Sequence, residues 1–239
     1  MVSTALFQTI NAWCALLPDA LWMILCLIGT GWAAFALIFP LIFKMPRTFT
    51  AAIISAPLAG LVSRIFKHFF STPRPPAVLE PDSFRLLVEV LKDSSMPSGH
   101  TITAFTVVAA IFFSQTAQTR KRLVWIWLIA IGAGLSRIAV GIHWTEDVIA
   151  GSLIGIATGY LGAVIARKIP DRRLTIQSIW IRLLSLWAPV CVYGLLRKPL
   201  DFNETMFVQQ ILAGLLTVAF CLFWYQSLFG QRSRLTPPL

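Results

Sequence analysis

Charged side chains are scarce in this chain. Only 13% of its 239 residues are Asp, Glu, Lys or Arg, whereas 57% are hydrophobic, and the mean hydropathy is +0.75. A soluble domain of this length needs a larger charged surface to remain in solution. Several apolar runs instead approach the ~20 residues that a helix needs to cross a bilayer. The composition therefore excludes an ordinary soluble protein and predicts an integral membrane protein.

Acidic residues and cysteines are also few. The chain has 10 Asp and Glu against 20 Lys and Arg, which gives a net charge of +10. Its basic residues stand in short clusters between apolar runs, as expected for topology signals and contacts with lipid headgroups, so no nucleic-acid partner is expected. The four cysteines stand singly in apolar stretches, without the spacing of a metal site or a disulfide framework. No metal and no cofactor are expected.

The apolar runs predict an all-α, polytopic transmembrane bundle of about six to seven spans in a single domain, residues 1–239. A closed barrel is disfavoured because the runs are continuous instead of alternating. Residues 1–18 form a short apolar stretch ending at Pro18, which predicts an interfacial helix. It is expected to stay in the mature protein, because the first basic residue is Lys44 and a cleavable signal peptide begins with a basic region. The expected spans are 19–43, 49–70, 98–117, 121–141, 145–167, and two additional C-terminal spans within 175–229 at 175–196 and 205–229.

Alternate connections between these spans are basic, and by the positive-inside rule they belong on the cytoplasmic side. The remaining connections, around 71–97, 142–144 and 197–204, are expected to face outward, with Trp144 as an interface anchor. This predicts an outward-facing polar site, which in a bacterial inner membrane would face the periplasm or cell exterior. The cytoplasmic residues are Lys44, Arg47, Arg120, Lys121, Arg122, Arg167, Lys168, Arg172, Arg173, Arg232 and Arg234.

Nearly all the unusual polar residues fall at the outward-facing helix ends. Three cations there suit a tetrahedral phosphate, because Arg pairs two phosphate oxygens and Lys adds a mobile charge. Gly99 lets a backbone approach a ligand, and free N–H groups at a helix N-terminus favour an anion. Only two carboxylates accompany them, which argues against a two-metal phosphatase. The set comprises Lys67, Arg74, Pro97, Ser98, Gly99, His100, Ser136, Arg137, His143, Glu146 and Asp147.

Two histidines could divide the work of phosphoryl transfer. A neutral imidazole attacks phosphorus when a carboxylate holds its other N–H, and His143 stands four residues before Asp147. His100 could then protonate the leaving oxygen and later activate water. A single basic residue near a span end is usually an anchor. His68 is interpreted as structural, and Arg64 and Arg182 as packing or interface residues. Arg137 is different, because it lies within a largely apolar span, where a charge is costly.

These residues resemble the signature of the type 2 phosphatidic acid phosphatase superfamily, which also includes vanadium haloperoxidases. That signature is a Lys, six residues and Arg-Pro, then Pro-Ser-Gly-His, then Ser-Arg, five residues, His, three residues and Asp. The chain reads Lys67-HFFSTP-Arg74-Pro75, Pro97-Ser98-Gly99-His100 and Ser136-Arg137-IAVGI-His143-WTE-Asp147, over the signature region 67–147. The resemblance implies a helical bundle with His143 as nucleophile, Asp147 as its orienting partner and His100 as general acid. It also implies that Lys67, Arg74, Ser98, Gly99 and Arg137 bind the phosphate.

The resemblance further implies a metal-independent lipid phosphatase with a phosphohistidine intermediate, acting on a lipid phosphate in the bilayer. Undecaprenyl diphosphate is the favoured substrate, followed by lipid A 1-phosphate, then phosphatidylglycerol phosphate or phosphatidate. A lipid phosphotransferase is an open alternative, and a membrane transporter is the alternative from a different class. A haloperoxidase is disfavoured because those members are typically soluble. The outer-loop residues could gate the headgroup or only solvate their loop, and the second is the favoured interpretation. They are Glu80, Asp82, Arg85, Glu89 and Lys92. The sequence does not indicate an oligomeric state.

Overall fold

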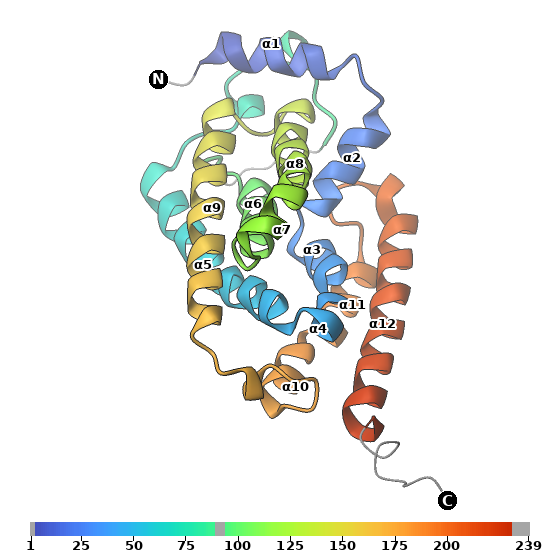
Figure 1. The fold of residues 1–239 in the computed structure, drawn as a ribbon. Coiled ribbons are helices and arrows are strands. Elements are labelled where there is room, and N and C mark those ends of the chain that lie inside the picture. Colours follow the sequence, from blue (N-terminus) through green and yellow to red (C-terminus); the bar gives the residue numbers. More distant parts are fainter. Residues whose placement is uncertain (1–2, 89–93, 231–239) are drawn as a thin grey trace, which may run out of the picture.

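The computed structural model describes residues 3–88 and 94–230, and throughout that part the regular structure is helical (Figure 1). Glu89, Lys92, Arg232 and Arg234 lie outside the described residues. The α-helices are α1 (Thr4–Cys14), α2 (Asp19–Ile28), α3 (Gly31–Ile38), α4 (Leu41–Lys44), α5 (Pro46–Phe70), α6 (Gly99–Phe113), α7 (Ala117–Leu123), α8 (Trp127–Ala139), α9 (Thr145–Arg167), α10 (Ile179–Ser185), α11 (Trp187–Arg197) and α12 (Met206–Phe229). Short 3-10 turns lie at Pro75–Ala77, Pro81–Ser83, Val124–Ile126, Asp171–Arg173 and Asn203–Thr205.

The predicted all-α membrane bundle is confirmed. Within residues 3–88 and 94–230, 5 helical stretches are long and apolar enough to cross a membrane, or up to 6 if the bent pair α1 and α2 is one span. The segment predicted as one span over 19–43 is instead three short helices, α2 to α4. The span predicted at 98–117 is α6, whose 15 residues are fewer than a bilayer crossing needs.

The break in the 19–43 segment has a local cause. The Thr30 hydroxyl accepts a hydrogen bond from the Ala33 N–H at 3.3 Å, which begins a new helix after Gly29. Pro40 lacks an N–H and stands at the start of α4. The run is continuously apolar, so its hydropathy does not reveal these two breaks in the helix.

Helix α1 lies across one end of the bundle, over the ends of α8 and α9 (Figure 1). It meets α2 at an angle of 113°. The buried side chain of Asn11 donates to Ile138 O at 2.9 Å and to Ala139 O at 3.2 Å. Both carbonyls belong to the last turn of α8, where carbonyl groups lack partners four residues further along the same helix. Asn11 therefore ties α1 to the end of α8, where Arg137 lies.

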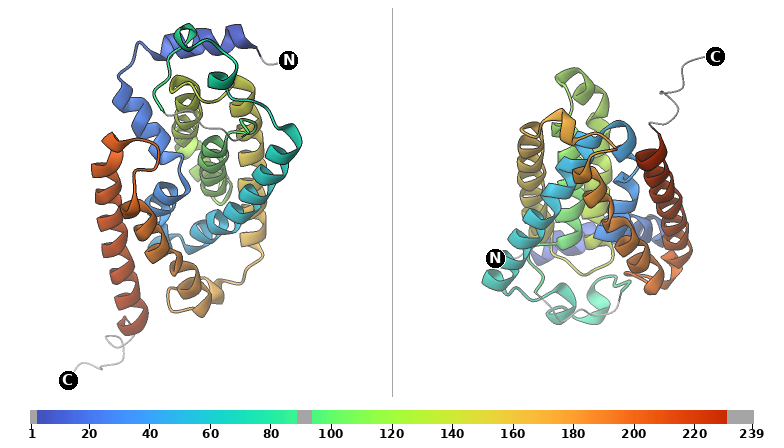
Figure 2. Two further views of the ribbon diagram at one scale, coloured as in Figure 1. Left: turned by 180° about the vertical axis from the view of Figure 1, so that it is seen from behind. Right: turned by 90° about the horizontal axis from the view of Figure 1, so that it is seen from below.

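Helices α6 and α9 lie side by side at unusually close range (Figures 1 and 2). A Cβ atom added at Gly155 would lie 2.6 Å from Phe105 Cβ and 2.7 Å from Ile102 O, and one at Gly151 would lie 2.9 Å from Ser98 O. Small residues let two helix backbones approach in this way. The contact brings the first turns of the two helices together, because the Ser98 N–H donates to Asp147 O at 3.1 Å.

The C-terminal helices α11 and α12 form a hairpin beside α3 (Figures 1 and 2). The contact uses large rings, such as Phe39 against Phe223 at 6.3 Å between centroids. Trp32 lies against α11, since a Cβ at Gly194 would be 2.8 Å from its indole. Arg182 on α10 donates to Ser227 Oγ at 2.7 Å, which fits the structural role predicted for it.

Candidate active site

His143 lies in the short turn between α8 and α9 and is 2% exposed. Gly141 makes the turn possible, because its φ of +86° is one that residues with a Cβ rarely adopt. His143 Nδ1 lies 3.2 Å from Asp147 Oδ2. The same carboxylate oxygen accepts the Trp144 N–H at 2.8 Å, as a residue in the first turn of a helix does for its N-cap. The helix start therefore fixes the carboxylate that faces the imidazole.

The other imidazole nitrogen faces a cation. Arg74 NH1 lies 3.1 Å from His143 Nε2 and donates to Ile142 O at 3.0 Å. A guanidinium can only donate, so Nε2 must accept, and we assign the proton to Nδ1, which donates to Asp147. In this tautomer the lone pair of Nε2 points toward Arg74.

Burial lowers the pKa of His143 well below its usual range, and the charges of Arg74, Arg137, Lys67 and His100 lower it further, in that order. The imidazole is therefore neutral at pH 7, as a nucleophile must be. These four predicted site residues therefore lie close enough to His143 to influence its pKa. The structure thus brings together side chains from α5, α6, α8 and two loops.

Ser95 belongs to this group and was missed by the sequence reasoning. Its hydroxyl donates to Asp147 Oδ2 at 2.5 Å and lies 3.4 Å from His143 Nδ1. Its own N–H donates to Thr72 O at 2.8 Å, so the loop holds it in place. Its position just before the Pro97-Ser98-Gly99-His100 motif was the available signal, but a serine in a polar loop is too common to single out.

Lys67 and Arg74 come from the end of α5 and the loop that follows. Ser71 ends the helix with a left-handed φ of 40°, which turns the chain back toward the bundle. The Lys67 ammonium donates to Ser94 O at 2.5 Å, and the Arg74 side chain is buried. Both predicted phosphate ligands therefore lie on the side of the site formed by the loops.

Helix α6 begins at Gly99 with Ser98 as its N-cap, so Pro97 lies just before the helix and not in its first turn as predicted. Ser98 is fully buried; its N–H is used by Asp147 O, and its hydroxyl accepts from Thr101 Oγ1 at 2.9 Å. Gly99 borders open space, since a Cβ there would meet nothing within 4 Å. Gly29 is a further residue that the sequence reasoning missed. A Cβ there would lie 3.0 Å from His100 Cβ, so the α2 backbone packs directly on that histidine.

Asp201 is the third residue that sequence reasoning missed. One oxygen, Oδ2, lies 2.9 Å from Arg137 NH1 and 2.8 Å from His100 Nε2. Burial raises the pKa of this carboxyl, but His100 and Arg137 lower it more, so it stays below its usual range. Asp201 lies 64 residues beyond Arg137, in a loop that was predicted only to face outward. No motif in the surrounding sequence identifies Asp201, because only the fold brings it to the site.

Two outer residues have roles other than those predicted. Trp144 was expected to anchor the membrane interface, but it is 3% exposed. Its indole N–H donates to Pro73 O at 2.8 Å, so it packs the site from inside. Arg85 was expected only to solvate its loop, yet it forms an ion pair with Asp19 and its N–H donates to Asn11 Oδ1 at 2.7 Å. It therefore fastens the outer loop to α1 and α2. Glu80, Asp82 and His68 are exposed.

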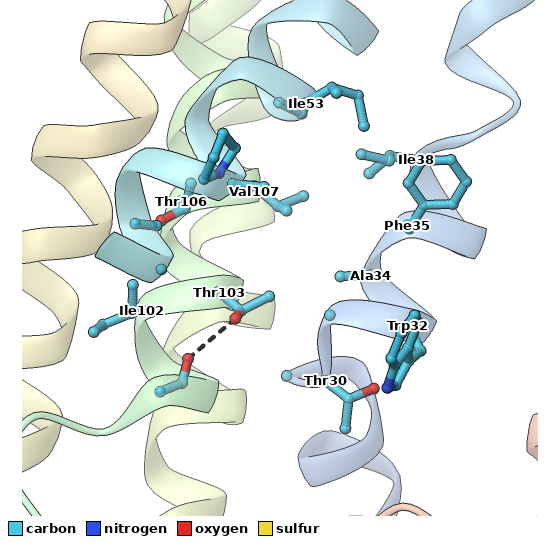
Figure 3. Close-up of a pocket in the computed structure, with 18 of the residues that line it drawn as sticks. Thr30, Trp32, Ala34, Phe35, Ile38, Ile53, Ile102, Thr103, Thr106 and Val107 are labelled. Carbon is cyan, nitrogen blue, oxygen red and sulfur yellow. Dashed lines mark hydrogen bonds between the residues drawn. The ribbon is translucent and has the colours of Figure 1, made fainter. Parts of the chain in front are cut away.

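A large apolar cavity of about 1030 Å³ adjoins the site. Figure 3 shows Trp32, Ala34 and Phe35 of α3 on one side of it, facing Ile102, Thr103 and Val107 of α6 on the other. Further wall residues come from α5, α10 and α11, and Arg64, predicted as a packing or interface residue, is among them. Polar groups gather where the cavity meets the site, at Lys67, His100 and Asp201. The cavity has the composition to hold a hydrocarbon chain whose polar end lies beside Lys67 and His100.

Residues 19–173 match the sequence pattern of the PAP2 superfamily. The chain belongs to this superfamily of membrane lipid phosphatases. The PAP2 region contains Lys67, Arg74, Ser98, Gly99, His100, Arg137, His143 and Asp147. It ends before α10, so Asp201 and the C-terminal hairpin lie outside it.

Curated PAP2 relatives match parts of the chain. A bacitracin transport permease protein BcrC of Bacillus licheniformis is 35% identical over 106 residues, covering 44% of this chain and 49% of that protein. An undecaprenyl-diphosphatase of Sulfolobus acidocaldarius is 29% identical over 139 residues, covering 56% of this chain and 63% of that protein. A lipid A 1-phosphatase of Porphyromonas gingivalis is 36% identical over 69 residues, covering 29% of this chain and 16% of that protein. The chain thus spans about half to two thirds of the first two relatives.

Two solved structures share the fold. Aquifex aeolicus LpxE superposes with a TM-score of 0.57 at 30% identity, covering 69% of this chain and 94% of that one. A PAP2-type phosphatidylglycerolphosphate phosphatase of Bacillus subtilis superposes with a TM-score of 0.54 at 20% identity, covering 70% of this chain and 89% of that one. Each superposition therefore leaves about three tenths of the present chain without a counterpart.

Proposed function

We propose that this protein hydrolyses a phosphate ester or anhydride of a membrane lipid through a phosphohistidine at His143. The observation that carries the proposal is the position of His143 Nε2. Asp147 holds the opposite nitrogen at 3.2 Å, and Arg74 lies 3.1 Å from Nε2. A phosphate bound by that guanidinium would present its phosphorus to the lone pair.

In the first step Nε2 forms a bond to phosphorus while the bond to the leaving oxygen breaks. His100 donates a proton to that oxygen, and Asp147 stabilises the imidazolium that forms. In the second step His100 takes a proton from water, the hydroxide attacks phosphorus, and inorganic phosphate leaves Nε2. Lys67, Arg74 and Arg137 offset the charge that develops on the equatorial oxygens.

This chemistry needs no metal, because cations of the protein take the place that metal ions fill in other phosphatases. Ser98 and Gly99 complete the phosphate site in the proposal. Gly99 leaves room for the headgroup beside the first turn of α6, where N–H groups favour an anion. Ser98 holds α6 to α9 and so keeps His100 near His143.

The substrate we propose is undecaprenyl diphosphate, with its prenyl chain in the apolar cavity. The cavity meets the site at Lys67 and His100, so a chain within it would place a headgroup on the histidines. The similarity to an undecaprenyl-diphosphatase favours this lipid, while the lipid A 1-phosphatase and the phosphatidylglycerolphosphate phosphatase indicate two competing substrates. Phosphatidate is a third.

We also propose that the site faces the periplasm or cell exterior of a bacterial inner membrane. The basic segments around Arg47 and Arg172 lie at the end of the bundle opposite α1 (Figure 1). Arg47 pairs there with Asp171 at 2.5 Å. The positive-inside rule assigns that end to the cytoplasm, and the histidines to the other side.

The test is release of inorganic phosphate by purified protein from each candidate lipid, in the presence of EDTA. We expect the highest kcat/KM with undecaprenyl diphosphate, full activity in EDTA, and inhibition by vanadate, which mimics five-coordinate phosphorus. Release from lipid A or phosphatidylglycerol phosphate alone would keep the phosphatase and change its substrate. No release from any of these lipids would contradict the proposal.

Phosphate release also distinguishes a hydrolase from a phosphotransferase and from a transporter. A phosphotransferase would pass label from the donor to an added acceptor lipid instead of releasing it as phosphate. A transporter, the activity named for the Bacillus licheniformis relative, would lose transport on His143→Ala in a protein that never releases phosphate.

A further inference from the structure

The strongest unexplained feature beside the site is the carboxylate of Asp201. It lies between α11 and the turn Asn203–Thr205, outside the region that matches the PAP2 pattern. A single oxygen contacts two of the site's residues, at 2.9 Å from Arg137 NH1 and 2.8 Å from His100 Nε2. An oxygen of a bound phosphate that pairs with Arg137 and faces the general acid would need the same place.

The loop that carries Asp201 is held firmly. Phe202, the next residue, is 5% exposed and packs in the apolar cluster that contains Trp22 and Ile142. The fully buried amide of Gln209 is placed to donate to Lys198 O at 3.2 Å and to accept the Leu200 N–H at 3.3 Å. The Asp201 carboxylate is 19% exposed, so it can leave Arg137 by rotation of its own side chain while the loop stays in place.

The charges explain why a resident anion is useful. Arg137 is 2% exposed, and its Nε has no hydrogen-bond partner within the part of the chain that the structure describes. A buried guanidinium without a counter-ion is strongly unfavourable. A substrate phosphate could serve as the counter-ion of Arg137. The Asp201 carboxylate, which contacts the same guanidinium, would repel that phosphate.

We propose that Asp201 occupies the phosphate subsite of the free protein, and that the lipid headgroup must displace it from Arg137 and His100. Asp201 thereby sets the affinity for phosphate and weakens inhibition by the released product. The inference rests on the proposed function, because it assumes that phosphate binds at Arg137 and His100.

The test compares Asp201→Asn with the unmodified protein, using the full chain in detergent micelles. Calorimetry with inorganic phosphate, and separately with vanadate, measures binding without any turnover. We expect Asp201→Asn to bind both anions about tenfold more tightly, because one like charge beside the ligand is removed. The KM for the lipid should fall by a similar factor. Glu204→Gln, at an exposed position in the same loop, removes the same charge and should change neither value.

Unchanged or weaker phosphate binding by Asp201→Asn would overturn the proposal and make Asp201 a support for Arg137. Asp201→Glu, which keeps the charge, should bind phosphate as weakly as the unmodified protein. If Asp201→Asn does not yield folded protein, Asp201→Ser removes the carboxylate with a smaller side chain and must show the same tightening. Absence of phosphate release from every lipid by the unmodified protein would instead contradict the proposed function, which is a separate result.

Discussion

Helices α6 and α9 meet through glycines, whereas the C-terminal hairpin meets α3 through aromatic rings. In the first region a Cβ at Gly155 would strike the backbone of α6 at 2.7 Å. In the second, Phe223 packs on Phe39 with the ring centres 6.3 Å apart, and a Cβ at Gly194 of α11 would lie 2.8 Å from the indole of Trp32. Close backbones fix the relative positions of His100, His143 and Asp147. The hairpin packs on α3 through side chains, lines part of the cavity and contributes Asp201.

The comparison teaches that the two regions serve different parts of the proposed reaction. The residues proposed to make and break bonds lie in the PAP2 region, residues 19–173. The hairpin adds an anion at the phosphate subsite and one wall of the cavity, through Trp187 and Cys191 of α11. Changes in the first region should therefore lower kcat, whereas changes in the second should alter KM and lipid preference.

The largest effect is expected at His143. His143→Ala removes the nucleophile and should lower kcat by about 10⁴-fold or more, as loss of a catalytic nucleophile does elsewhere. Phosphate release from the preferred lipid measures this. His68→Ala is the matched control, because it removes an exposed histidine from α5 outside the site and should leave kcat unchanged. Retention of more than a few per cent of activity in His143→Ala would remove this residue from the mechanism.

The next largest effect is expected at Gly155, with Gly214 of α12 as the control position. Gly155→Ala forces α9 away from α6, which should cost about 1–3 kcal/mol of stability and lower kcat about tenfold or more by moving Asp147. Gly214→Ala meets open space and should change neither quantity. Thermal unfolding in detergent and phosphate release measure both variants. Equal effects of the two substitutions would show that the losses in Gly155→Ala do not come from the close contact between α6 and α9.

The wall of the cavity that α10 forms should affect lipid binding alone. Leu184→Trp projects a larger side chain into the cavity and should raise KM for a long prenyl or acyl lipid about tenfold, because apolar chain is excluded. Hydrolysis of a short, water-soluble phosphate ester should be unchanged. Leu183→Trp, on the same helix but 53% exposed, is the control. If the long lipid and the short ester were affected equally, the cavity would not be the chain-binding site.

The smallest effect concerns pH. A lowered pKa keeps His143 neutral to more acidic pH than an ordinary histidine, so activity should persist below the usual value of about 6.5. The acid limb of kcat/KM between about pH 4 and 8 reports this, because protonation of Nε2 removes the nucleophile. An acid limb at or above the ordinary value would show that His143 is not held neutral by burial and by Arg74.

Much of the site could be predicted from the sequence, because its residues lie in short motifs at helix ends. The spacing of His143 and Asp147 fixes their contact once a helix begins at Thr145, and the structure has that contact. The membrane bundle followed from the apolar runs. Residues whose role depends on long-range packing could not be predicted. Asp201 reaches the site only through the hairpin, and Gly29 matters only because α2 packs on His100.

The errors have the same origin. Hydropathy predicted a single span over residues 19–43, because it does not detect that the Thr30 hydroxyl caps a new helix. An aromatic residue at an outward turn suggested an interface anchor at Trp144, but the loop folds back so that its indole donates to Pro73 O. In both cases a specific hydrogen bond overrode a property averaged over a segment.

The central claim is that His143 forms a covalent bond to phosphorus. The most direct test quenches the protein with ³²P-labelled lipid diphosphate in alkaline detergent, where a phosphohistidine survives, and maps the label by peptide mass spectrometry. The account predicts label that is stable in base, lost in acid, located on His143 and absent from His143→Ala. Label on another residue, or label that persists in His143→Ala, would contradict it.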